Sequence, residues 1–313
     1  MVKSITVSKL NQNIPDDIKT DMLFKEIQKD TVGRSGGDPT WGYVYDKKNG
    51  DLKLKGIALH KEYDYDYPMS AYGEKAWSIF GKEILGESVR VPEIDIVEQS
   101  LGYKEIISYR LMNNDKEDMT HIKDTLFNKF ERDEMKAKKD IYSIDELLEC
   151  VKLEINDEEN YKKVEKDIIQ VLLLDAVTNN GDRHALNWGL VRDEKTNNHT
   201  LAVFDHASAF IDMFEDKSYF LTDGWSSTYV TVGNDKGKNY LGSDGRKVTE
   251  YICKEFPEYF DEFVDRFNEK LPKILEQINQ EKMKIDYFRF DLKIKGKRNF
   301  LNKLRNRGEL EYE

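Results

Sequence analysis

The 313-residue sequence has few cysteines and no long hydrophobic runs, and each shortage excludes a class of protein. Two cysteines, Cys150 and Cys253, cannot form the disulfide framework of a small secreted domain, so free thiols are expected. No apolar run approaches the ~20 residues of a membrane-spanning helix. Residues 1–17 lack the apolar core of a secretory signal. We therefore predict a cytoplasmic protein without a membrane span, and leave open a secreted effector that lacks a conventional signal.

Positive charge is also in deficit. The chain has 49 Lys and Arg against 60 Asp and Glu, a net charge of −11, which argues against nucleic acid as a direct partner. Residues 282–307 are the exception, because Lys and Arg far outnumber Asp there. We interpret this segment as a solvated helical face that balances an acidic body. A docking patch for an acidic partner or an anionic surface is the alternative.

The order of predicted elements indicates an α+β fold. Hydrophobic residues make up 39% of the chain, and a chain of this length can bury a sizeable core. The first part is rich in strands with one prominent helix, and the second part is helical. The predicted strands cover 41–63, around a turn at Asn49-Gly50, and 105–112, and the predicted helices cover 73–86, 145–153 and 255–280, with a further helix opened by Asn156 and Glu159. The sequence thus predicts a β-rich N-lobe over 1–113 and an α-helical C-lobe over 114–313.

Residues 175–210 carry the most specific chemical pattern. Asp182 and Asn187 form a D-x-x-x-x-N arrangement, and Asp205 follows the apolar run 201–204. Phosphoryl transfer from ATP needs a carboxylate that orients or deprotonates the attacking hydroxyl, an amide oxygen on Mg²⁺, and a second carboxylate on the metal. Magnesium takes oxygen ligands and keeps several waters, so one Asn and one Asp can suffice beside the phosphates.

The stretches NNGDRHALNWGLV and LAVFDHASAF resemble the HipA-like serine/threonine kinases of bacteria. The G-D-R-H core is similar to that of the phosphoinositide kinases, and both groups belong to the protein-kinase-like superfamily. The resemblance implies a two-lobed kinase fold that uses ATP and Mg²⁺, with Asp182 as the base and Asn187 and Asp205 as metal ligands. It also allows a toxin role with an antitoxin-like partner.

A glycine-rich stretch in the N-lobe is the candidate cover for the ATP phosphates. Gly33, Gly36 and Gly37 allow the backbone to approach closely and point amides at phosphate. An ordinary glycine-rich hairpin is the alternative. The resemblance implies a phosphorylatable hydroxyl in this loop, for which Ser35 fits best and Thr31 second.

The phosphate clamp should lie on the following strand. Alternation places Lys61 on one face with Ile57 and Leu59, and Lys61 ends the apolar run as the lysine of the family does. Lys53 and Lys55 are competitors. We expect Glu74 to open the next helix and to pair with Lys61, with Glu83 as the alternative. The resemblance further implies that the backbone from Tyr109 to Met112 binds adenine.

Two neighbouring features leave alternatives open. Arg183 is expected to pair with Asp205 or with a phosphorylated residue. His184 and His206 lack the H-x-x-x-H or H-x-H spacing of a transition-metal site, which disfavours a metal hydrolase.

The sequence therefore favours an ATP-dependent serine/threonine protein kinase that acts on a protein hydroxyl. Residues 222–231 have no Lys or Arg to hold an anionic lipid headgroup, which favours a peptide acceptor. A phosphoinositide or small-molecule kinase is one alternative, and a pseudokinase that serves as an ATP-binding scaffold is another.

Overall fold

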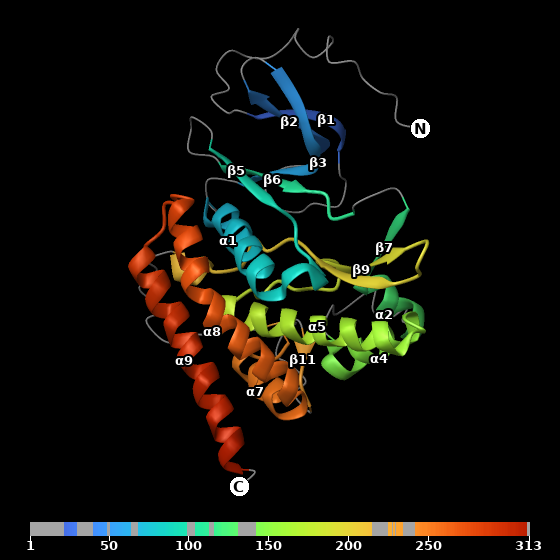
Figure 1. The fold of residues 1–313 in the computed structure, drawn as a ribbon, viewed down its shortest axis with the longest axis vertical. Coiled ribbons are helices and arrows are strands. Elements are labelled where there is room, and N and C mark those ends of the chain that lie inside the picture. Colours follow the sequence, from blue (N-terminus) through green and yellow to red (C-terminus); the bar gives the residue numbers. More distant parts are fainter. Residues whose placement is uncertain are drawn as a thin grey trace. The chain divides into compact units, whose positions relative to one another are not determined.

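The computed structural model describes residues 22–29, 40–48, 51–63, 68–98, 104–112, 116–130, 142–214, 225–226, 228, 230–233 and 242–311 (Figure 1). The chain divides into two compact units, one of residues 1–68 with 94–110 and one of residues 69–93 with 111–313. Strands dominate the first unit and helices the second, so the predicted α+β fold is confirmed.

The first unit is built on an antiparallel five-stranded sheet in the order β1-β2-β3-β6-β5. Its strands are β1 (Met22–Lys29), β2 (Thr40–Lys48), β3 (Asp51–Tyr63), β5 (Ile94–Glu98) and β6 (Lys104–Tyr109). The pairing of β2 with β3 ends at Lys48↔Asp51, which confirms the predicted hairpin, and the two turn residues lie outside the described part. Val44, Ala58 and Ile107 form a small buried core on one face of this sheet.

The second unit also contains a sheet, of which the sequence predicted only the strand before Asp205. Its order is β4-β10-β9-β7. The strands are β4 (Val89–Arg90), β7 (Glu117–His121), β9 (Trp188–Asp193) and β10 (His199–Val203), and a separate two-stranded pair joins β8 (Tyr142–Ser143) to β11 (Val230–Thr231). These strands are short and flanked by helices, so their local pattern is too brief to distinguish from loop.

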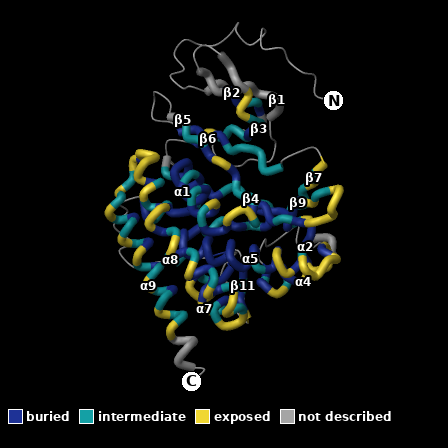
Figure 2. Tube along the Cα trace, viewed as in Figure 1, coloured by how far each residue is buried: buried dark blue, intermediate teal, exposed yellow. Residues whose placement is uncertain are grey.

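Helices fill the rest of the second unit. They are α1 (Pro68–Leu85), η2 (Gly86–Ser88), α2 (Ile122–Phe130), α4 (Ile144–Glu154), α5 (Glu158–Thr178), α6 (Ile211–Phe214), α7 (Gly245–Glu255), α8 (Pro257–Gln280) and α9 (Tyr287–Glu311). From Asp167 onward every residue of α5 is buried (Figure 2). Most polar side chains buried in this way are hydrogen-bonded.

Several predicted ends of elements are wrong by a few residues. Helix α1 begins at Pro68, five residues before the predicted start. The N-cap of α5 is Asp157, whose side chain accepts from the Asn160 amide, and Asn156 lies outside the helix. The capping box that the sequence predicted there is found instead at Ser143 and Glu146, at the start of α4.

The basic C-terminal segment forms α9, and several of its cations pair with groups of the chain itself. Arg298 bonds Asn268 of α8, and Arg305 pairs with Asp265 of α8. Lys295 pairs with Asp291 one turn earlier. These contacts support the interpretation of a balancing helical face. Among the helices that the structure describes, none combines the length and apolarity needed to cross a membrane.

Candidate active site

The two candidate metal ligands lie at one end of the β9–β10 hairpin. The pair Trp188↔Val203 closes the hairpin, so Asn187 and Phe204 leave it side by side. The Phe204 amide donates to the Asn187 carbonyl at 3.1 Å. Asp205 follows directly, so the hairpin brings Asn187 next to the backbone that carries Asp205.

The side chain of Asn187 is oriented for an acceptor role. Its Nδ2 donates to the backbone carbonyl of Asp182 at 2.7 Å, and because a carbonyl can only accept, this bond fixes which end of the amide is nitrogen. No donor from the described residues contacts Oδ1. This oxygen is therefore available to a ligand, and oxygen is the donor that Mg²⁺ prefers.

Asp205 has a left-handed backbone, with φ of 58°. Such a conformation is uncommon for a residue with a Cβ and persists only where the surroundings hold it. Hydrogen bonds hold the backbone of both residues that flank Asp205. The carbonyl of Phe204 accepts from Arg183 Nη1 at 2.8 Å, and the amide of His206 donates to Glu74 Oε2 at 2.9 Å. A held, strained carboxylate residue at this place indicates a functional constraint.

Arg183 is a buried residue that joins residues 182–187 to their neighbours, and its side chain is only 2% exposed. Its Nε donates to Asp175 Oδ2 at 2.8 Å, and its Nη1 donates to the carbonyls of Asn187 and Phe204 at 2.7 and 2.8 Å. Its Nη2 lies 2.6 Å from His206 Nδ1. The ion-pair partner of Arg183 is Asp175 of α5, so the expected pairing with Asp205 is wrong, and a pairing with a phosphorylated residue stays a prediction.

Sequence reasoning missed Asp175, and it placed Trp77 only on the apolar face of its helix. Asp175 also accepts from Trp77 Nε1 at 3.0 Å and from Asn180 Nδ2 at 2.8 Å. The Trp77 ring stacks on His206 with centroids 3.6 Å apart. The available signal was a lone aspartate within an apolar helical run, which must be paired if it is buried. His206, fully buried in these contacts, has a structural role.

Glu74 lies in the middle of α1 and not at its start, and it is 1% exposed. Its described bond is to the His206 amide. Lys61 lies on β3 opposite Ile106, in the other unit, so the pairing of Lys61 with Glu74 stays a prediction. Within its own unit, α1 contributes the Glu74 carboxylate, which accepts a hydrogen bond from the amide of His206, the residue after Asp205.

The competing residues in the N-lobe have other partners. Lys55 pairs with Asp95 at 2.7 Å and lies over the Tyr109 ring. Glu83 pairs with Lys273 at 2.8 Å. Burial acts to raise the pKa of Glu83, but the hydrogen bonds from Lys273 and Gln277 and the nearby charges of Lys273 and Lys270 together outweigh it, so the pKa is lowered. Lys55 and Glu83 are thus each engaged within their own unit, and the roles of Lys61 and Glu74 stay predictions.

The predicted nucleotide contacts are only partly covered by the structure. Tyr109 is the last residue of β6, and its hydroxyl donates to Asp95 at 2.8 Å. Met112 follows three residues later in irregular backbone and is partly exposed. The predicted phosphate cover and its hydroxyls lie outside the described residues, namely Gly33, Ser35, Gly36, Gly37 and Thr31.

A buried lysine from α9 reaches the segment that was predicted to receive the acceptor. Lys297 is 5% exposed, and its Nζ lies 3.5 Å from the centroid of the Trp225 ring. The same Nζ donates to Asn179 Oδ1 at 3.0 Å, and Asn179 is the left-handed cap that ends α5. The amide of Ser226 bonds that oxygen too. The sequence prediction counted Lys and Arg only within residues 222–231. It therefore missed Lys297, which reaches this segment from α9.

No protein-family model and no curated protein matches the sequence. Solved structures do match. The Helicobacter pylori proinflammatory kinase CtkA superposes with a TM-score of 0.60 at 13% identity, over 91% of this chain and 97% of CtkA. The toxin HipA of Shewanella oneidensis MR-1, solved with HipB and its operator DNA, superposes with a TM-score of 0.54 at 14% identity, over 96% of this chain and 72% of HipA. The chain thus has the α+β fold of CtkA and HipA, which confirms at the level of fold the HipA-like kinase resemblance predicted from the sequence.

Proposed function

We propose that this chain is an ATP-dependent serine/threonine protein kinase of HipA-like type, with ATP and Mg²⁺ as cofactors. The observation that carries the proposal is the end of the β9–β10 hairpin, where Asn187 lies beside Phe204, the residue before Asp205. The Asn187 amide nitrogen bonds the Asp182 carbonyl, no described residue donates to its amide oxygen, and the backbone on both sides of Asp205 is held. Kinase-like folds place their metal ligands on such a loop and strand.

In this proposal each residue has one task. Asp182 accepts the proton of the attacking hydroxyl or orients it, and Asn187 and Asp205 hold magnesium. Bound magnesium would neutralise charge on the β- and γ-phosphates. Lys61, aligned by Glu74, would contact the phosphates as a point charge.

The rest of the nucleotide would be bound by the N-lobe. The loop with Gly33, Gly36 and Gly37 would cover the phosphates, and the backbone from Tyr109 to Met112 would bind adenine. Ser35 in that loop is the proposed site of autophosphorylation.

The proposed acceptor is a protein Ser or Thr, not a lipid. Lys297, whose Nζ lies over the Trp225 ring, is buried and bonded to Asn179, so it is poorly placed to bind an anionic headgroup. HipA was solved with HipB, and an antitoxin-like protein is the partner that we propose by analogy. Direct binding of nucleic acid is not expected from a chain of net charge −11.

The test is transfer of radiolabelled phosphate from Mg-ATP. Asp182→Ala and Asp205→Ala should each lower transfer by about a hundredfold or more, because each removes a base or a metal ligand. Asp118→Asn, an exposed change on β7, is the matched control and should keep full activity. Circular dichroism should show that all three variants are folded. Wild-type rates in both site variants would refute the proposal, and label that enters only phosphatidylinositol would refute the protein acceptor.

A further inference from the structure

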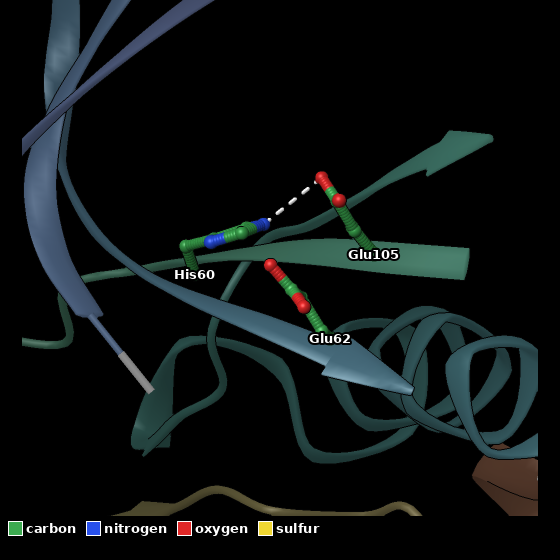
Figure 3. Close-up of side chains that lie close together, drawn as sticks. All are labelled: His60, Glu62 and Glu105. Atoms are coloured by element: carbon green, nitrogen blue, oxygen red, sulfur yellow. Dashed lines mark hydrogen bonds and ion pairs between the residues drawn. The ribbon is translucent and has the colours of Figure 1, made fainter. Parts of the chain in front are cut away.

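Three potential metal ligands converge on one face of the sheet in the first unit (Figure 3). His60 and Glu62 are two residues apart on β3, so their side chains share a face. The register of β3 with β6 places Glu105 directly opposite Glu62. One donor atom from each residue lies within 4.8 Å of the other two, and His60 Nε2 is 3.0 Å from Glu105 Oε2.

The two carboxylates of this cluster repel each other. Like charges directly opposite each other on neighbouring strands are destabilising, and Glu62 and Glu105 form such a pair. His60 contacts Glu105, whose side chain is only 12% exposed. Glu62 makes no hydrogen bond or ion pair with any residue that the structure describes. A divalent cation between the three groups would neutralise both carboxylates at once.

The donor set indicates which cation. One imidazole nitrogen with two carboxylate oxygens suits zinc, at ligand distances of about 2.0–2.2 Å, whereas calcium and magnesium favour oxygen ligands throughout. Neighbouring ligands of a tetrahedral zinc are therefore about 3.3–3.6 Å apart. His60 Nε2 and Glu105 Oε2, now 3.0 Å apart, would separate by a few tenths of an ångström to reach that spacing. A rotation of the exposed Glu62 side chain would bring its oxygen, at most 4.8 Å from the other two donor atoms, to the same spacing.

We propose that His60, Glu62 and Glu105 bind one zinc ion, with water as the fourth ligand. Zinc at this place would tie β3 to β6 at their paired ends and stabilise the sheet of the first unit. Lys61 lies between two of the ligands in sequence, and alternation turns its side chain to the opposite face. If the proposed kinase function holds, the site would also steady the strand that carries the phosphate clamp.

The experiment is calorimetric titration of the metal-free full-length chain with ZnCl₂. Millimolar Mg²⁺ is present throughout, so that sites made of oxygen ligands are filled. We expect one zinc per chain with micromolar or tighter affinity. Glu62→Gln and His60→Gln should each weaken binding about tenfold or more, since loss of a ligand costs at least as much as loss of an outer-shell partner. Glu194→Gln, a matched change at an exposed turn, should bind like the wild type.

Glu62 is exposed, so its substitution keeps the fold and the bond between His60 and Glu105. Unchanged affinity in both site variants would overturn the proposal and place zinc elsewhere, and so would a wild type that binds no zinc. A Co²⁺-loaded wild type that shows a thiolate charge-transfer band would point to Cys150 or Cys253 and would overturn it as well. The readout is binding, so its failure is separate from any failure of kinase activity.

Discussion

Replacement of Asp175 by Asn tests whether the buried ion pair under the catalytic loop is structural. Asp175 accepts from Arg183 Nε and Nη2, from Trp77 and from Asn180. Asparagine keeps the shape and one acceptor oxygen but removes the charge. Arg183 would then be an unpaired cation in a site where both partners are only 2% exposed.

The magnitude follows from that burial. Breaking a buried pair by neutralising one partner costs about 3–5 kcal/mol, because the remaining charge stays desolvated. For a domain of this size each kcal/mol lowers the melting temperature by about 2–4 °C, so Asp175→Asn should lower it by at least about 6 °C. Kinase activity should fall as well, because Arg183 holds the carbonyls of Asn187 and Phe204.

Thermal melts by calorimetry provide the assay. Asp265→Asn is the matched control, because it removes the same charge from the pair with Arg305, whose aspartate is 73% exposed. An exposed pair contributes about 1 kcal/mol or less, so this variant should melt close to the wild type. Equal melting temperatures of the two variants would refute the interpretation that the buried pair of Arg183 and Asp175 is structural. They would favour an Arg183 that is free to bind phosphate.

Three further predictions concern other parts of the chain. Burial raises the pKa of Asp167 from 3.8 to about 6, so the free energy of unfolding falls as the pH rises from 3.8 to about 6, where the unfolded chain has lost the proton and the folded chain still holds it. Asp167→Asn should therefore add at most about 3 kcal/mol to the free energy of unfolding at pH 7, and urea melts without a gain there would contradict this. Lys297→Met should cost about 2 kcal/mol by loss of a charged hydrogen bond to Asn179, and it should raise KM for the protein acceptor but not for ATP; unchanged melts and KM would exclude a positioning role. Incubation with Mg-ATP should place phosphate, with about −1.5 to −2 charges, on Ser35 or Thr31 and lower activity, and mass spectrometry that finds it only in the C-terminal half would contradict this.

Local sequence patterns predicted most of the helices and the residues of the candidate site. Helical spacing found the core faces of α1, α4, α5 and α8, and their predicted apolar residues, such as Trp77 and Ile168, are buried. The Asn-Gly turn found the β2–β3 hairpin. The kinase-like pattern predicted Asn187 and Asp205 as joint metal ligands. The β9–β10 hairpin, of which only β10 was predicted, is what returns the chain from Asn187 to the residue before Asp205.

The ends of elements were less predictable, since they depend on which side chain reaches which backbone group. Asp157, not Asn156, caps α5, and the capping box lies at Ser143 instead. The sheet of the second unit was missed except for β10, because strands of two to six residues carry little periodicity.

By itself, the sequence determined the α+β order of elements and the ordered set Asp182, Asn187 and Asp205. The tertiary structure alone decided which groups hold that set in place. Glu74 bonds the His206 amide across 132 residues, and Lys297 bonds Asn179 across 118. Sequence requires that such buried polar groups find partners, because desolvation without a bond is costly. Which partner each one meets depends on how distant helices pack, and no local pattern encodes that.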